Sequence, residues 1–271
     1  AQIKTACCFG ALNAPGTTLI RARKSRNHTE LLFKYLNIPI KVKSNKLYDL
    51  IEINGLQQFN SFDYSIPGDI SSSSFFIVLT ILSKESELVI KKVNINSSRM
   101  GILKILKLMN IKIIIKNRKN YKGEIIADLY IKSQKNILPI NCPTKFNSES
   151  IDEFLLIFLV AAKAKGVSYF KNLSELNEKE SPRLNWGSKI LKKMGVKNVL
   201  KGSTLKIYGN PNLKISKKIV IKNFLNDHRV FMTSVIAALS FGGAWEIYDK
   251  NSINTSFPTF LKKLNQLGLK I

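Results

Sequence analysis

Four stretches of the chain are apolar around nearly the whole helical circumference, and each predicts a helix buried on several sides. They span residues 1–14, 71–83, 150–166 and 227–243. A turn and a short β-rich run follow each stretch, such as "SELVIKKV" after the second. The longest apolar runs, "FLLIFLVAA" and "FFIVLTIL", fall well short of the roughly 20 residues that a membrane span requires. The pattern therefore predicts buried helices of a globular protein and no membrane segment.

After each β-rich run comes a helix pattern with one apolar and one charged face, which predicts a helix at the surface. These patterns span residues 25–38, 97–111, 181–196 and 255–269. Strand pairs close the first three units, as "IKVKS" with "LYDLIEING" does in the first. The sequence thus predicts an α/β fold of repeated units, with buried helices inside sheets and two-faced helices between sheet and solvent.

The limits of the repeat predict a domain boundary. The Pro-Gly turn in "SIPGD" separates residues 1–65, one unit of a first domain, from residues 66–271, a second domain. Because the chain opens inside one unit and ends inside another, we expect partner segments outside it. Its first residues, "AQIKTACCFGALNAPG", have no initiator Met and no signal-peptide pattern.

The net charge of +25 raises the possibility of nucleic-acid binding. Most of the basic residues are Lys scattered among Ile and Asn, which favours compositional drift together with a preference for small anionic substrates. No aromatic–basic RNA-binding pattern occurs, so no nucleic-acid partner is predicted. Three cysteines without metal-ligand spacing favour a reducing cytoplasm.

The stretch "NEKESPRL" predicts a helix start with unusual charge. Ser181 is a favourable N-cap, and Pro182 then takes the first helical position, where its missing N–H is no loss. Arg183 places a cation beside the positive end of the helix, which is unfavourable by some tenths of a kcal/mol. We therefore expect an anion near Arg183.

Arginines recur at predicted helix starts, where backbone N–H groups and a guanidinium together favour phosphate or carboxylate. The others are Arg26, Arg99 and Arg229. Convergence of two or three of them would form an anion pocket. Alternatively each lies over the surface or pairs with a neighbouring carboxylate, which is the interpretation we favour for Arg99.

Carboxylates that could move protons are few. Asp152 and Glu153 stand before a very apolar helix, and Glu180 follows Lys179. A carboxylate at such an edge near cations can act as a base, or it can simply complement the helix dipole. His28 and His228 are each more typical of structural hydrogen bonding. The loops and spacings for nucleotides, dinucleotides and zinc are absent, so no cofactor or metal is predicted.

Several blocks of the chain stand out in a fixed order: "AQIKTACCFGALNAPGTTLI", "SRNHTE", "PGDISSSSFF", "SIDEFLLIFLVAA", "NEKESPRL", "NDHRVFMTSVIAAL" and "NTSFPTF". In this order and near this spacing they resemble the 5-enolpyruvylshikimate-3-phosphate (EPSP) synthase family. The resemblance implies six α/β units in two domains, forming an inside-out barrel. It also implies transfer of the enolpyruvyl group of phosphoenolpyruvate to the 5-hydroxyl of shikimate 3-phosphate, by a cytoplasmic enzyme that is a monomer when complete.

The resemblance implies a role for each matching position. Asp152 is implied as the base for the 5-hydroxyl and Glu180 as the acid near the methylene carbon. The implied ligands of shikimate 3-phosphate are Ala1, Gln2, Arg26, Asp152 and Lys179, and those of phosphoenolpyruvate are Gln2, Arg183 and Arg229.

The chain also departs from the family pattern. The N-terminal third of the family, with its phosphate-binding turn, has no counterpart here, so we expect the chain alone to be inactive. Pro182 stands where the family usually has Asp, Asn27 replaces another Asp, and Thr255 replaces a Lys of one branch. The alternatives are a UDP-N-acetylglucosamine enolpyruvyl transferase, a non-catalytic basic binding module, and a degenerate fragment.

Overall fold

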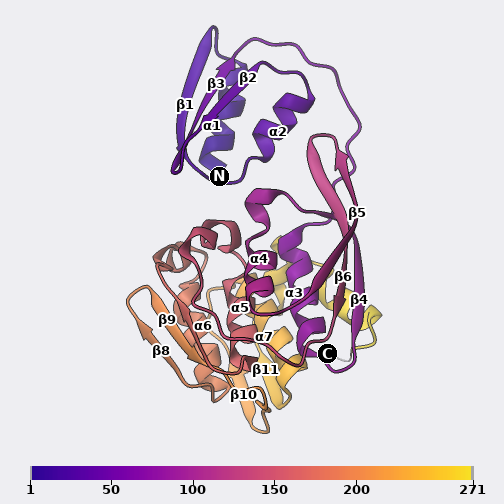
Figure 1. Cartoon of the computed structure of the whole chain (residues 1–271), viewed down its shortest axis with the longest axis vertical. Coiled ribbons are helices and arrows are strands. Elements are labelled where there is room, and N and C mark those ends of the chain that lie inside the picture. The colour runs from indigo at the N-terminus through magenta and orange to yellow at the C-terminus, as the bar shows by residue number, and fades with distance from the viewer. Residues whose placement is uncertain (1, 270–271) are drawn as a thin grey trace.

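A computed structural model of the chain describes residues 2–269, and Ala1 lies outside the described residues. Figure 1 shows a small body that holds the first unit and a larger body that holds the remaining elements. Buried apolar side chains form two separate clusters, one in each body. A division of the chain near residue 65 is compatible with these two cores, and the boundary stays a prediction.

The first unit is a three-stranded antiparallel sheet with two helices. Its strand order is β1-β3-β2, and its small core contains Cys8, Phe33, Ile51 and Ile53. Its elements are α1 (Gln2–Leu12), β1 (Thr17–Arg23), α2 (His28–Tyr35), β2 (Ile40–Ser44) and β3 (Tyr48–Asn54).

The next two units repeat this topology, because their strand orders are β4-β6-β5 and β7-β9-β8. In each sheet the first strand of the unit pairs with the third, antiparallel. The predicted repeat is therefore confirmed. The elements are α3 (Ile70–Leu82), β4 (Glu87–Asn94), α4 (Gly101–Leu108), β5 (Ile113–Tyr121), β6 (Glu124–Lys132), α5 (Phe154–Lys163), β7 (Val167–Phe170), α6 (Arg183–Lys193), β8 (Asn198–Lys201) and β9 (Thr204–Tyr208).

The last unit contains a strand that the sequence pattern did not predict. β10 (Lys218–Ile221) precedes α7 (His228–Phe241) and pairs in parallel with β11 (Ala244–Ile247), which follows that helix. A helical crossover is the usual way to join parallel strands. The run "KIVI" is too short to stand out by itself, and it becomes a strand because β11 pairs with it. α8 (Phe260–Gln266) follows.

Helices α3, α5 and α7 pack against one another inside the larger body, and the sheets lie around them (Figure 1). The predicted burial of these helices is confirmed. Serine and threonine side chains are accommodated inside α3 because their hydroxyls donate to carbonyls one turn back. Ser74 Oγ donates to the Ile70 carbonyl at 2.7 Å, and Thr80 Oγ1 donates to Phe76 at 2.8 Å.

The prediction that the first apolar helix is buried on several sides is wrong for α1. Only Lys4, Cys8 and Ala11 of this helix are buried, and Ile3 is 82% exposed. The described chain packs α1 against the sheet of its own unit. Apolar composition predicts burial only when further helices pack on the remaining faces.

We expect the Gly187→Ala substitution to lower the free energy of unfolding by about 1–3 kcal/mol, because overpacking displaces neighbours in a dense core. A Cβ at Gly187 of α6 would lie 2.7 Å from Phe158 and 3.1 Å from Leu155, both on α5. Urea unfolding measures this effect. Gly10→Ala in α1 is the matched control, because a Cβ there meets nothing within 4 Å. Equal stability of the two variants would contradict tight packing of α6 on α5.

Candidate functional site

The N-terminal ends of the three buried helices meet on the side of the larger body that faces the first unit. Ser71, in the first turn of α3, donates to Glu153, which precedes α5. Arg229, in the first turn of α7, donates from Nη1 to the backbone carbonyl of Asp152 at 2.8 Å. Free N–H groups at helix starts favour anions, so three such ends in one place favour a negatively charged ligand.

Four cationic side chains surround the Asp152 carboxylate. Arg26, from the first unit, forms an ion pair with its Oδ2 atom. Nη1 of Arg183 lies 3.3 Å from Oδ1, while Nζ of Lys179 and Nε of Arg229 each lie 3.9 Å from it. The structure thus brings together residues from both bodies that are far apart in the sequence. We call Arg26, Lys179, Arg183 and Arg229 the cation cluster.

The cation cluster sets the charge of Asp152. Burial would raise the pKa of this carboxyl, but Arg229, Arg26 and Lys179 outweigh burial and hold the pKa well below its ordinary value. Asp152 is therefore ionised at neutral pH. One carboxylate among four cations leaves positive charge for anionic ligands.

Arg183 is buried, with 2% of its surface exposed, and protein carboxylates supply the anion that its position required. Its Nε atom donates to Asp227 Oδ2 at 2.8 Å, and its Nη2 atom donates to Asp227 Oδ1 at 3.3 Å. Nη2 also pairs with Glu180, whose side chain is 53% exposed. Glu180 therefore lies at the solvent side of the cluster.

The predicted start of α6 is wrong by one residue. The helix begins at Arg183, so Pro182 takes the N-cap position rather than the first helical position. Ser181 does not cap the helix, because its hydroxyl donates to Asp227 at 2.8 Å. Asn177 Oδ1 instead accepts from the Leu184 backbone N–H at 3.0 Å. Because the capping side chain comes from a preceding turn, the residues next to the start of α6 do not show an N-cap pattern.

Gln2 and Arg26 line a hollow of about 280 Å³ in the first unit, together with Thr5, Ala6 and His28. This hollow opens beside the cation cluster, because Arg26 belongs to both. The prediction for Ala1 lies outside the described residues.

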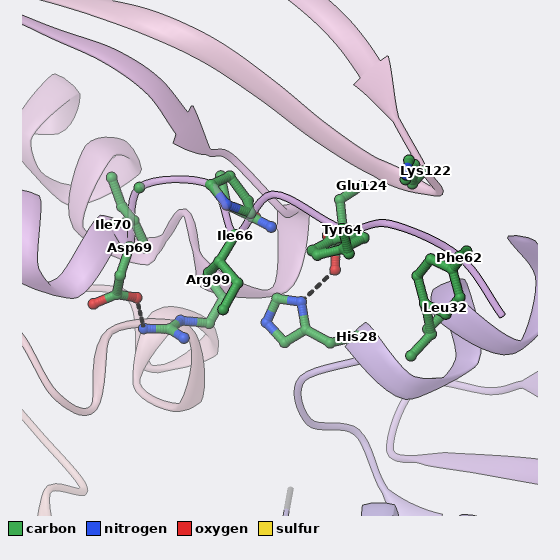
Figure 2. Close-up of a pocket in the computed structure, with 13 residues that line it drawn as sticks. His28, Leu32, Phe62, Tyr64, Ile66, Asp69, Ile70, Arg99, Lys122 and Glu124 are labelled. Atoms are coloured by element: carbon green, nitrogen blue, oxygen red, sulfur yellow. Dashed lines mark hydrogen bonds and ion pairs between the residues drawn. The ribbon is translucent and has the colours of Figure 1, made fainter.

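A second hollow, of about 400 Å³, lies between the first unit and the larger body (Figure 2). Phe62 and Tyr64 of the connecting segment line it. Most of its ionisable groups are paired with one another, and Lys122 lies over the Phe62 ring. Arg99 contacts Asp69 at 3.0 Å, and His28 pairs with Glu124. None of the predicted site residues that the structure describes lines this hollow. The prediction that Arg99 pairs with a neighbouring carboxylate is confirmed.

Asn27 and Thr255, two positions at which the chain departs from the family pattern, each form a hydrogen bond within the protein. Asn27 precedes α2 without a capping bond, and its side-chain oxygen accepts from Asn96 Nδ2 at 2.9 Å. Thr255 Oγ1 donates to the Ser252 carbonyl at 3.3 Å.

His228 lies beside the cation cluster at the start of α7. Burial has the largest effect on this side chain and lowers its pKa, and the neighbouring Arg229 lowers the pKa further.

Sequence reasoning gave no role to Asp227 or Ser71, and it named Glu153 only as a carboxylate that could act as a base or complement the helix dipole; all three are buried. Asp227 had a local signal, because an Asp directly before a helix is typical of an N-cap. Its backbone partner is the Arg229 N–H at 2.8 Å. Ser71 and Glu153 meet across 82 positions of the sequence, and no local pattern predicts that contact.

We expect the free energy of unfolding to fall as the pH drops from about 5 toward 2. Asp227 is buried, but its bonds with Arg183 and Ser181 outweigh burial and lower its pKa, and the pKa of Asp152 is lowered as well. A carboxyl with a lowered folded-state pKa stabilises the protein above its unfolded pKa and loses that contribution as the pH falls. Glu153 has the opposite effect on stability. Burial raises its pKa, so its contribution to the free energy of unfolding becomes more favourable as the pH falls.

Urea unfolding at several pH values measures this dependence. The Asp227→Asn variant should show a shallower decline, because it lacks one of the responsible carboxyls. A stability that is constant between pH 6 and about 3 would contradict the charge assignment.

Within residues 2–269, no helix is long and apolar enough to cross a membrane. The same residues contain no group of His, Cys, Asp and Glu side chains arranged to hold a metal ion.

Solved structures identify the fold first. An enolpyruvyl transferase, NikO from Streptomyces tendae, superposes with a TM-score of 0.70 over 99% of this chain, at 17% identity. This likeness shows the enolpyruvyl transferase fold, built of α/β units as an inside-out barrel. An EPSP synthase structure from Acinetobacter baumannii superposes with a TM-score of 0.89 at 29% identity, covering 98% of this chain and 60% of that one.

The family follows from the sequence comparisons. The family model for EPSP synthase (3-phosphoshikimate 1-carboxyvinyltransferase) matches residues 1–264. Relatives named 3-phosphoshikimate 1-carboxyvinyltransferase include one from Ruthia magnifica, 34% identical over all of this chain and 61% of its own length. Another, from Petrotoga mobilis, is 36% identical over 96% of this chain and 59% of its own. The chain belongs to the EPSP synthase family, and it spans about 60% of the length of these relatives.

Proposed function

We propose that this chain carries part of the active site of an enzyme that transfers the enolpyruvyl group of phosphoenolpyruvate to the 5-hydroxyl of shikimate 3-phosphate. The supporting observation is the convergence of Arg26, Lys179, Arg183 and Arg229 on Asp152. Both substrates carry phosphate and carboxylate groups, and guanidinium groups bind such anions through paired hydrogen bonds. Relatives that carry the name of this activity support the same assignment.

The cation cluster divides between the two substrates in this proposal. Arg26 and Lys179, with Gln2 and Ala1, bind shikimate 3-phosphate on the side of the first unit. Arg183 and Arg229, with Gln2, bind phosphoenolpyruvate at the starts of α6 and α7. Holding both reactants in one pocket supplies a large part of the rate enhancement.

Two carboxyl groups move the protons. Asp152 takes the proton of the 5-hydroxyl, whose oxygen forms a bond to the central carbon of phosphoenolpyruvate. Glu180 protonates the methylene carbon of phosphoenolpyruvate, and a tetrahedral intermediate results. The new methyl group then returns a proton to Glu180, phosphate departs with the proton held by Asp152, and the double bond is restored in the product.

The ligand-free charge state of Asp152 constrains this step. A carboxylate whose pKa lies far below 7 accepts protons poorly. Substrate anions that pair with Arg26 and Lys179 weaken the influence of these cations on Asp152 and raise its pKa. Binding of shikimate 3-phosphate thereby activates its own base.

We further propose that the chain alone is inactive, because the relatives are longer and further residues complete the pocket. The complete enzyme is expected to be a cytoplasmic monomer that requires no cofactor. A UDP-N-acetylglucosamine enolpyruvyl transferase is less well supported, since the relatives reported above are named 3-phosphoshikimate 1-carboxyvinyltransferase.

Calorimetric titration of the chain separates the alternatives. The ligands are shikimate 3-phosphate, phosphoenolpyruvate, UDP-N-acetylglucosamine and a nucleic-acid duplex at moderate salt. Each is tested with and without an N-terminal portion of an EPSP synthase supplied separately. Binding of the first two ligands, strengthened by the N-terminal portion, supports the proposal. Binding of nucleic acid without either metabolite would overturn it in favour of a basic binding module.

A further inference from the structure

Asp227, at the N-cap of α7, is completely buried, and both oxygens of its carboxylate accept hydrogen bonds from the protein. Oδ1 accepts the Arg229 backbone N–H at 2.8 Å. Oδ2 accepts both the Ser181 hydroxyl and Nε of Arg183 at 2.8 Å. A buried carboxylate is costly unless it is paired and hydrogen-bonded, and this one is both.

The bonds of Asp227 leave one edge of the Arg183 guanidinium directed toward the site. Asp227 takes the edge formed by Nε and Nη2. The remaining nitrogen, Nη1, points to Asp152, and Nη2 also contacts the half-exposed Glu180. A guanidinium can bind one carboxylate on each of two edges, so Asp227 holds Arg183 by one edge and presents the other.

The same carboxylate also fixes Arg229. By capping α7, Asp227 sets the first turn of that helix, from which the Arg229 side chain reaches the Asp152 carbonyl at 2.8 Å. One residue thus connects the two arginines, although they lie on different helices.

We propose that Asp227 is a positioning residue that orients both Arg183 and Arg229 toward phosphoenolpyruvate. This inference rests on the proposed function. It also accounts for Pro182, which stands where the family usually has Asp. Arg183 has a carboxylate partner from α7, and Pro182 is therefore compatible with an ordered Arg183.

The test is the affinity of the chain for each metabolite after Asp227→Asn, measured by calorimetry in the presence of the supplied N-terminal portion. Loss of a charged hydrogen bond corresponds to about a 10- to 100-fold weakening, which we expect for phosphoenolpyruvate. The affinity for shikimate 3-phosphate should stay within about twofold, because Arg26 and Lys179 have no bond with Asp227 among the described residues.

A double-mutant cycle with Arg183→Lys distinguishes a positioning role of Asp227 from a purely structural one. If Asp227 acts in part through Arg183, the double variant should lose less binding free energy for phosphoenolpyruvate than the sum of the two single losses, and the part that remains acts through Arg229. The matched control is Glu30→Gln, which removes another buried carboxylate from an ion pair, that with Lys4 at 2.5 Å in the first unit. This control should lower stability without changing the ratio of the two affinities.

The outcomes are distinct. If the unmodified chain binds neither metabolite, the proposed function fails and the inference fails with it. If the chain binds both, the inference alone is overturned when Asp227→Asn weakens both equally, weakens neither, or adds fully to Arg183→Lys. Should Asp227→Asn not fold, Ser181→Ala replaces it, with an expected loss for phosphoenolpyruvate of about threefold. No loss in that variant would overturn the inference.

Discussion

The Arg183→Ala variant is expected to lose about 3–5 kcal/mol of unfolding free energy, because removing one partner of a buried ion pair leaves the other charge uncompensated. Asp227 is the partner left behind, and it is completely buried. Urea denaturation of the unmodified chain and the variant measures the difference. Such a loss is large beside the total stability of a typical domain.

Arg99→Ala is the matched control for this prediction. Arg99 also pairs with an aspartate, Asp69, but the side chain of that partner is 46% exposed. Exposed ion pairs contribute about 0–1 kcal/mol, so the control should lose far less stability than Arg183→Ala. Equal losses in the two variants would contradict the claim that Arg183 and Asp227 form a buried structural pair.

The Asp152→Asn variant is expected to lower turnover by about 100- to 10,000-fold in the chain completed by an N-terminal portion, which is the usual contribution of a general base. Asn keeps the size of the side chain but cannot accept the proton of the 5-hydroxyl. The measurement is the rate of phosphate release at saturating concentrations of both metabolites. Affinity for these anions should be retained, because the cation cluster remains.

Glu149→Gln serves as the control, because Glu149 lies three positions before Asp152 and pairs with Lys104 at 2.5 Å, outside the cation cluster. Its turnover should equal that of the unmodified protein. A loss of less than about tenfold in Asp152→Asn would contradict the role of Asp152 as the base.

Local sequence patterns predicted the repeated architecture because it depends on local periodicity. The alternation of all-apolar and two-faced helices distinguishes buried from surface helices, and the structure agrees for α3, α5 and α7. The arginines at helix starts were also visible in the sequence. Their unfavourable position relative to the helix dipole indicated nearby anions, and Asp152, Asp227 and Glu180 supply negative charge there.

Contacts between distant segments were not predictable from local patterns. The exposure of α1 depends on what packs against it, and β10 is a strand because β11 lies beside it. Asp227 could be read as a helix cap, but its bond with Arg183 joins residues 44 positions apart. The pairing of Arg26 with Asp152 spans 126 positions and the two bodies of the protein. A site made by such contacts emerges only from the folded chain.

The most direct measurement follows phosphorus NMR signals after phosphoenolpyruvate, shikimate 3-phosphate and an N-terminal synthase portion are mixed with this chain. The account predicts that inorganic phosphate appears only when all four components are present, together with a new phosphorylated product. If both metabolites bind to the completed protein and no phosphate is released, the cation cluster around Asp152 is not a working transferase site.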